Sequence, residues 1–527
     1  MCGFIFSSNI DLKETFTDNF EKIAHRGPDD AEIITTDHSL WGFHRLAIMD
    51  LTTAGNQPFI HNNKELMCNG EIYNSENLRK FLEPYYTFHS NSDCEVLLPL
   101  FEQVGIDSMV RMLDGEFAFV VSDNKTGKIW AARDPFGIRP LFYGYDKKKQ
   151  KIAFASEAKG LIAWCEKIMP FPPGHYYTNG EFHLFNDVGN SKLMIEQPLD
   201  VLCEGIRWRL KHAVIKRLHS DAPMGFLLSG GLDSSLVCAI AQKHLEQPIE
   251  TFAIGMENDP IDLKYAKEVA DFLGTHHHEV TMSKEDVLKA VKDVIYHLET
   301  WDITTIRASI GMYLVAKYIH EKTDIKTLLT GEVADEIFGY KYTDFAPNAT
   351  AFQKEAQKRV RELYMYDVLR ADRTLAAHSL EARVPFADLD FANYVMSINP
   401  TRKMNTYGKG KYLLRHAFDT KNYLPHDILS REKAAFSDAV GHSMVDYLKE
   451  HAEKLYSDLD LLNAKEKYPT HPPFTKEALW YREIFEKFYT GNANWIVNFW
   501  MPNKKWVGKD VNDPSARVLK NYGDSGK

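Results

Sequence analysis

The chain has 527 residues, of which 44% are hydrophobic and 26% charged, a composition typical of a globular protein with roughly two to four domains. The formal net charge of −10 argues against a nucleic acid or an anionic membrane as the main partner, and no apolar run approaches the ~18 residues of a membrane span. The six cysteines are scattered without a C-x-x-C pair and no signal-peptide pattern follows Met1, so we expect free thiols and a cytoplasmic protein.

The first ~190 residues alternate short β-type runs with turn residues, which predicts an α+β domain. Helices are expected near residues 12–24, 75–82 and 94–104. Strands are expected within residues 41–49, 66–68, 116–122, 128–132 and 151–156. The segment 185–198 contains Asn-Asp and Gly-Asn pairs and is predicted to be a linker, so we divide the chain into domains 2–190 and 191–527.

Strands and helices alternate after this linker, the pattern of a parallel, doubly wound sheet. An amphipathic helix over 199–218 leads into the first strand. Strands are expected at 226–228, 249–254, 276–280 and 327–330, with helices at 263–273 and 284–298. The last ~190 residues are predicted to be mostly helical, for example at 356–377 and 477–488.

Cys2 follows the initiator methionine, whose removal would leave a thiol and an α-amine on one carbon. That amine, with an ordinary pKa of about 7.7–8.0, can act as the base for the thiol. Taken alone, Met-Cys is more often a chance event. Five further motifs follow in order: His-Arg-Gly-Pro-Asp (25–29), Arg-Leu-Ala-Ile (45–48), Asn-Gly-Glu-Ile-Tyr-Asn (69–74), Ser-Asp-Cys-Glu (92–95) and Arg-Asp-Pro-Phe-Gly (133–137).

Together with Cys2 these motifs resemble the class II, N-terminal-nucleophile (Ntn) glutamine amidotransferase domain. The resemblance implies that glutamine is hydrolysed to glutamate and ammonia through a thioester on the cysteine. Arg45 would then hold the substrate carboxylate, and Glu71 and Asp93 would face its α-ammonium. Asn69 and the N–H of Gly70 would form the oxyanion hole, although an Asn-Gly pair is by itself more often a hairpin turn.

The segment Ser-Gly-Gly-Leu-Asp-Ser-Ser at 229–235 stands between an apolar strand and a helix. Paired glycines allow close backbone approach, and a helix start presents N–H groups to an anion. No Gly-Lys-Ser/Thr follows, so it is not a Walker A loop. It resembles the pyrophosphate loop of the ATP-pyrophosphatase family, which forms acyl-adenylates.

Further segments at 251–255, 301–307, 330–336, 380–386, 411–415 and 431–437 follow in an order that resembles the glutamine-hydrolysing asparagine synthetases of the B type. The resemblance implies that ATP and aspartate form β-aspartyl-AMP, from which ammonia displaces AMP, in a homodimer whose other partners are small molecules. The residues that would contact ATP are Leu228, Ser229, Gly230, Gly231, Asp233, Ser234, Ile254, Thr330 and Gly331.

Asp233 and Asp335 are the candidate Mg²⁺ ligands, because hard cations on phosphates prefer carboxylate oxygens. Glu332 would promote adenylation or accept a proton from ammonia, and Lys433 would neutralise the phosphates. Arg383 is a weaker candidate for a substrate or phosphate contact.

Val333 stands where this family usually has glycine. A β-branched residue tolerates φ > 0 poorly, so the loop either has an ordinary conformation there or has shifted. Three alternative functions remain: a ligase acting on another carboxylate, as in β-lactam synthetases, a phosphoribosyl amidotransferase, and a nucleotide-sensing pseudoenzyme with an altered Val333 loop. Cys2 argues against the first and the 229–235 segment against the second.

Two other features have plain structural interpretations. The three consecutive histidines at 276–278 cannot converge on one metal ion, because neighbouring residues of a strand face opposite ways. The aromatic segment 495–500 is expected to pack against the C-terminal core.

Overall fold

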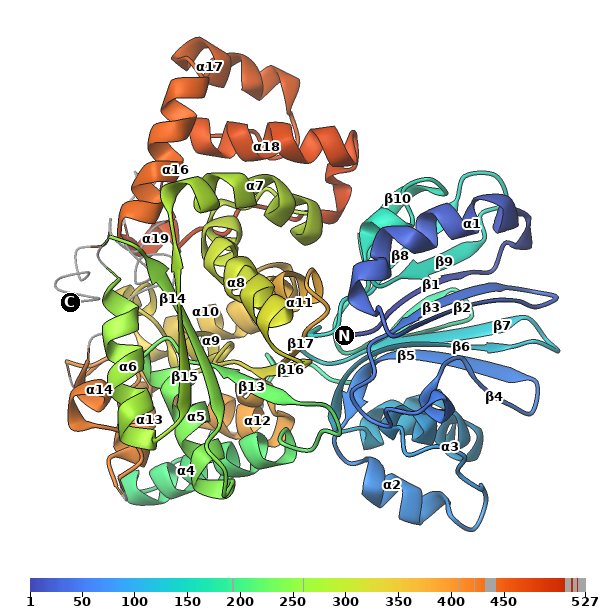
Figure 1. Cartoon of the computed structure of the whole chain (residues 1–527), viewed down its shortest axis with the longest axis horizontal. Coiled ribbons are helices and arrows are strands. Elements are labelled where there is room, and N and C mark those ends of the chain that lie inside the picture. Colours follow the sequence, from blue (N-terminus) through green and yellow to red (C-terminus); the bar gives the residue numbers. More distant parts are fainter. Residues whose placement is uncertain are drawn as a thin grey trace.

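The computed structural model describes residues 1–191, 194–258, 260–406, 408–420, 422–431, 442–507, 513–514 and 519. The chain forms two parts that lie side by side (Figure 1). We call residues 3–184 the N-terminal sandwich and residues 199–507 the C-terminal part. None of the helices formed by the described residues is long and apolar enough to cross a membrane.

The N-terminal sandwich contains two six-stranded antiparallel sheets, ordered β10-β8-β9-β1-β3-β2 and β12-β11-β7-β6-β5-β4. The strands are β1 (Gly3–Ser7), β2 (Asp30–Thr35), β3 (Leu40–Arg45), β4 (Phe59–His61), β5 (Lys64–Ile72), β6 (Gly115–Asp123), β7 (Lys128–Arg133), β8 (Phe142–Asp146), β9 (Ile152–Ala155), β10 (Cys165–Pro170), β11 (His175–Thr178) and β12 (Glu181–Leu184).

Helices cover the outer face of each sheet (Figure 1). Helix α1 (Lys13–Phe20) packs on the sheet that contains β1, through Phe16 and Phe20. Helices α2 (Ser75–Leu82) and α3 (Leu97–Met112) cover the other sheet. The aromatic side chains of Phe4, Phe6 and Trp41 fill the space between the sheets, so the sandwich has a helix–sheet–sheet–helix layering.

The C-terminal part contains a five-stranded parallel sheet ordered β15-β14-β13-β16-β17. Its strands are β13 (Met224–Leu227), β14 (Glu250–Met256), β15 (His276–Met282), β16 (Thr327–Leu329) and β17 (Glu381–Arg383). Helices lie on both faces, which explains why the inner strands β13, β14 and β16 are mainly apolar (Figure 1). The α+β and doubly wound fold predictions are therefore confirmed.

The helices of the C-terminal part first alternate with the strands of this sheet and then form a mostly helical segment, as predicted. They are α4 (Leu199–Lys216), α5 (Leu232–His244), α6 (Ile261–Leu273), α7 (Lys284–Leu298), α8 (Ile303–Lys322), α9 (Ala334–Phe338), α10 (Ala349–Glu362), α11 (Asp367–Ala376), α12 (Leu389–Ser397), α13 (Tyr412–Phe418), α14 (His426–Ser430), α16 (His442–Leu455), α17 (Asp458–Lys467), α18 (Lys476–Tyr489) and α19 (Lys504–Val507).

Two expectations about secondary structure are wrong. The continuous helix expected over 356–377 is two helices, α10 and α11, because the chain leaves the helical region at Tyr366 (φ −130°, ψ −90°). The strand β17 was not expected, because three residues carry no readable periodicity. By contrast, the aromatic segment 495–500 packs as expected: Trp495 is buried and donates to the Glu299 carbonyl at 2.8 Å.

Buried ion pairs join the two parts. Arg26 of the sandwich lies 2.9 Å from Asp372 of α11 and 2.8 Å from Glu157, with all three side chains at most 1% exposed. Arg217, which follows α4, reaches Glu116 of β6 at 3.0 Å. Charges buried this completely need partners with fixed geometry, so the interface holds the two parts in one arrangement.

Candidate active sites

Cys2 immediately precedes β1 at the boundary between the two parts. Its thiol donates to the Leu46 carbonyl at 3.6 Å, and Arg26 Nε donates to the Cys2 carbonyl at 2.9 Å. Burial raises the pKa of the Cys2 thiol to about 11 and lowers the pKa of the Met1 amine to about 6. With Met1 attached, the thiol is therefore protonated at neutral pH and has no amine on its own Cα.

Asn69 and Gly70 lie on β5, which packs against β1. The Asn69 side chain is fully buried, and neither its Oδ1 nor its Nδ2 has a hydrogen-bond partner among the described residues. A buried amide left unpaired in this way is costly unless a ligand completes it. At Gly70 a Cβ would lie 2.4 Å from the Glu116 carbonyl oxygen of β6, so only glycine fits.

Three charged residues predicted to bind glutamine surround the same region. Arg45 ends β3, and its guanidinium donates to the Thr52 carbonyl at 2.6 Å, which fixes its orientation. Glu71 and Asp93 are both buried, and burial raises the pKa of each carboxyl. The negative charge of the buried Glu381 adds to the rise in pKa of Cys2, Glu71 and Asp93.

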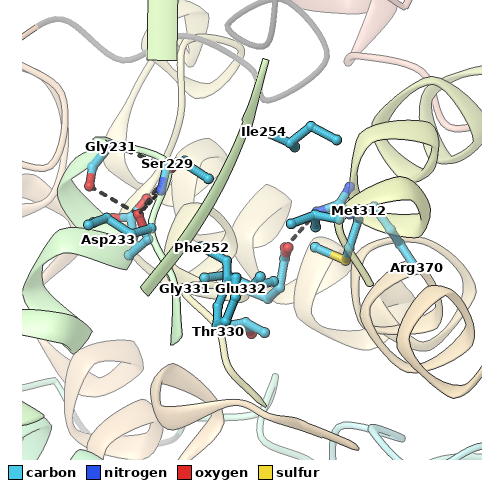
Figure 2. Close-up of a pocket in the computed structure, with 15 residues that line it drawn as sticks. Ser229, Gly231, Asp233, Phe252, Ile254, Met312, Thr330, Gly331, Glu332 and Arg370 are labelled. Carbon is cyan, nitrogen blue, oxygen red and sulfur yellow. Dashed lines mark hydrogen bonds and ion pairs between the residues drawn. The ribbon is translucent and has the colours of Figure 1, made fainter. Parts of the chain in front are cut away.

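A cavity opens at the carboxyl ends of β13, β14 and β16 (Figure 2). The strand order reverses direction here, since β14 follows on one side of β13 and β16 lies on the other. Ligands of doubly wound sheets bind at such a switch point. The cavity lining includes Leu228, Ser229, Gly231, Asp233, Ser234, Ile254, Thr330, Gly331 and Glu332.

Of the residues predicted to contact ATP, Gly230 alone is absent from this lining. It has φ +68°, and a Cβ there would lie 2.5 Å from the Ala266 backbone nitrogen of α6, so it makes the turn rather than the cavity wall. The hydroxyls of Ser229 and Ser234 lie 3.0 Å apart. The Thr330 hydroxyl is buried without a hydrogen-bond partner in the described part of the chain, and so can bond a ligand.

Glu332 faces Arg370 of α11 across the cavity, with Arg370 Nη2 2.5 Å from Glu332 Oε2 (Figure 2). Sequence reasoning missed Arg370, because a residue on an amphipathic helix 38 positions away carries no motif. It also missed the side chains of Phe252 and Met312, which line the cavity next to Ile254. These apolar neighbours would suit the face of a purine ring.

Lys411 lies between the two candidate metal ligands. Its Nζ is 2.8 Å from Asp233 and also forms an ion pair with Asp335. The two carboxylates thus converge on one positive charge. No larger group of metal-binding side chains exists in the described regions, and Mg²⁺ on phosphates ordinarily needs only one or two carboxylates.

The backbone at Val333 adopts φ 79° and ψ −19°, in the left-handed region. The expectation of an ordinary conformation at this position is therefore wrong: the valine adopts backbone angles that favour glycine. Its side chain is 1% exposed and packs with Ile337 and Phe338. Packing therefore offsets the backbone strain.

Two further predictions concern residues away from this cavity. Arg383 does not line it; its guanidinium points to the sandwich and lies 3.1 Å from Glu71. The interpretation of Arg383 as a phosphate contact is thus wrong. Lys433 lies outside the described residues.

Each of the two parts of the chain matches a known protein family. The family described as glutamine amidotransferase domain matches residues 1–174, and the family described as asparagine synthase matches residues 205–350 and 342–507. The chain belongs to the asparagine synthetase family. The two matched regions fall on the N-terminal sandwich and the C-terminal part respectively.

Asparagine synthetases (glutamine-hydrolyzing) from several organisms match this family member over most of its length. The Homo sapiens protein is 41% identical over 542 residues, which cover 95% of each chain. The Gallus gallus protein is 42% identical over 95% of each, and Arabidopsis thaliana asparagine synthetase 3 is 44% identical over 90% of this chain and 84% of its own length.

Among solved structures, the glutamine phosphoribosylpyrophosphate amidotransferase from B. subtilis is 17% identical, with a TM-score of 0.31, covering 53% of this chain and 65% of its own. The family assignment of this asparagine synthetase rests on the sequence matches alone.

Proposed function

We propose that this chain is a glutamine-hydrolysing asparagine synthetase, which uses ATP to amidate aspartate through β-aspartyl-AMP. The observation that carries the proposal is its 41–44% identity to glutamine-hydrolyzing asparagine synthetases over 90–95% of the chain. We place the boundary between the glutaminase domain (2–190) and the synthetase domain (191–527) after residue 190. Family likeness supports a cytoplasmic homodimer with small molecules as its other partners.

In the proposed glutaminase step, the Cys2 sulfur attacks the amide carbon of glutamine after Met1 has been removed. The freed α-amine takes the thiol proton and returns it to the departing ammonia, leaving a thioester that water hydrolyses to glutamate. The unpartnered amide of Asn69 and the Gly70 N–H would stabilise the oxyanion. Glu71 and Asp93 would bind the α-ammonium and Arg45 the α-carboxylate.

In the proposed synthetase step, the phosphates of ATP lie on the 229–235 loop at the start of α5, where helix N–H groups favour an anion. Leu228, Ile254, Thr330 and Gly331 would hold the rest of the nucleotide. The aspartate β-carboxylate attacks the α-phosphorus and pyrophosphate leaves. Glu332, held by Arg370, would then accept a proton from ammonia as it displaces AMP.

Asp233 and Asp335 would hold Mg²⁺, which when bound would neutralise charge on the phosphates. Their convergence on Lys411 supports this role. Lys433 would add a further positive charge to the same phosphates. Ammonia is mostly protonated at pH 7, so its transfer inside the protein would preserve it as a nucleophile.

The decisive experiment measures asparagine and AMP formed from aspartate and ATP with either glutamine or ammonium as donor. Cys2→Ala should abolish the glutamine-dependent rate and leave the ammonium-dependent rate unchanged, because the cysteine acts only on glutamine. Glu332→Gln should lower both rates. Failure of the unmodified protein to make asparagine from either donor would contradict the proposal.

A further inference from the structure

The three-residue strand β17 belongs to the parallel sheet of the C-terminal part but lies beside the N-terminus of the chain (Figure 1). Its two charged side chains both meet residues of the N-terminal sandwich. Glu381 is 3.4 Å from Arg139, and Arg383 is 3.1 Å from Glu71. The synthetase sheet thus supplies charged groups to the region proposed to bind glutamine.

The Arg383 side chain is fully buried and held from several sides. Its Nη1 donates to the main-chain carbonyls of Arg217 and His219, at 2.9 and 2.5 Å, and its Nε lies 3.2 Å from Glu381. A guanidinium is a planar, rigid fork, so these bonds fix the direction in which Nη2 meets the Glu71 carboxylate. Lysine could supply the charge at this place but not the same geometry.

Glu71 requires such a partner because of its surroundings. It is 6% exposed, and burial raises the pKa of its carboxyl, an effect that the nearby Asp93 adds to and the Arg383 guanidinium opposes. Two neighbouring buried carboxylates do not both stay ionised without a compensating cation. Both must be ionised to receive an α-ammonium together.

The main chain of Arg383 contacts a residue of the proposed nucleotide site. In the sheet Arg383 pairs with Leu329, and its carbonyl accepts a hydrogen bond from the Thr330 N–H at 3.0 Å. Thr330 lines the proposed ATP cavity. One residue therefore touches the proposed glutamine site through its side chain and the proposed nucleotide site through its backbone.

We propose that Arg383 is a positioning residue for glutamine recognition, contributed by the synthetase domain, which orients the Glu71 carboxylate toward the α-ammonium of glutamine. The glutamine-binding surface is then incomplete without β17. This inference rests on the proposed function, in which Glu71 binds that ammonium.

The test uses the full-length protein with Arg383→Lys and Arg383→Gln, and measures glutamine hydrolysis and ammonium-dependent asparagine synthesis in the same preparations. Arg383→Gln should raise the KM for glutamine about 10- to 100-fold, since the buried ion pair with Glu71 is lost, while kcat changes less. Arg383→Lys should recover part of the loss. The ammonium-dependent rate reports whether the variant has folded.

A second measurement distinguishes the loss of Glu71 orientation from a general loosening of the glutamine site. Glutaramate is glutamine without the α-amino group, so it cannot use Glu71. The ratio of kcat/KM for glutamine to that for glutaramate should fall at least tenfold in Arg383→Gln. Glu71→Gln should lower the same ratio, and the double variant should be no worse than the more impaired single one, because the two side chains act as a unit.

Arg217→Lys is the matched control, because Arg217 is another fully buried arginine in the same interface that binds Glu116 rather than Glu71. It should leave the glutamine-to-glutaramate ratio unchanged. An unchanged ratio in Arg383→Gln, or an equal fall in Arg217→Lys and Arg383→Lys, would overturn the inference. If the unmodified protein hydrolyses no glutamine, the proposed function fails instead.

Discussion

The Lys411 ammonium lies 2.8 Å from both carboxylate oxygens of Asp233, at the end of the cavity where we propose that magnesium and the phosphates bind. The same ammonium reaches Asp335. Lys411 therefore supplies the positive charge that the two carboxylates face, and it would compete with a metal ion for them.

Lys411→Met should remove that competition. We expect the nucleotide-free variant to bind Mn²⁺ more tightly than the unmodified protein, because Asp233 and Asp335 would no longer face the Lys411 ammonium, which repels a divalent cation. Titration of free Mn²⁺ by electron paramagnetic resonance measures the effect. Lys147→Met, at an exposed turn, serves as the control, and equal Mn²⁺ binding by both variants would contradict the expectation.

The KM for glutamine should depend on pH through Glu71 and Asp93. Burial raises the pKa of both carboxyls, so they lose their charge above the ordinary carboxyl range of about 4 to 5. As the pH falls, the KM for glutamine should begin to rise at a pH above this ordinary carboxyl range. Glutamine binding should release protons, because the α-ammonium requires both carboxyls to be ionised. Arg383→Gln should move the rise to higher pH. Steady-state kinetics across pH, with ammonium-dependent synthesis as the reference, checks both statements.

Val333→Gly should cost little stability. Glycine relieves about 1–2 kcal/mol of left-handed strain, which offsets most of the about 2 kcal/mol of lost burial. Val360 of α10 is equally buried but helical, so Val360→Gly should cost about 3 kcal/mol. Urea unfolding of the two variants gives the comparison; equal losses would mean that Val333 is not strained.

Asp372→Asn should destabilise the folded chain by about 3 kcal/mol, because it removes one charge from the buried pair with Arg26. Asp107→Asn breaks the exposed pair with Arg111 and should leave the urea midpoint unchanged. A similar effect of both substitutions would show that the buried pair contributes no more to the free energy of unfolding than the exposed pair.

Protein that retains Met1 should hydrolyse no glutamine while it still uses ammonium. Met1 is fully buried in front of Cys2, and its attachment converts the Cys2 amine to a peptide nitrogen that accepts no proton from the thiol. Expression with methionine aminopeptidase inhibited would supply such protein, with intact mass as the check on Met1. Glutamine hydrolysis by the retained form would exclude the α-amine as the base.

Local sequence patterns predicted much of this fold. The helices over 75–82 and 284–298 begin and end as expected, and the strand–helix alternation after residue 199 predicted the parallel sheet. What the patterns missed depends on distant contacts. The pairs Glu332–Arg370, Asp233–Lys411 and Glu71–Arg383 join residues 38, 178 and 312 positions apart, and neither periodicity nor a motif records which charge meets which.

The buried charges between the sandwich and the C-terminal part also limit how this enzyme can be recombined. A chimera that joins the glutaminase half to a foreign synthetase at the 185–198 segment would bury Arg26, Glu71 and Glu116 without partners wherever that synthetase lacks counterparts of Asp372, Arg383 and Arg217. Such a chimera has a continuous chain, but its buried interface contains charges without partners. A working exchange must transplant α11, β17 and the end of α4 together with the sandwich.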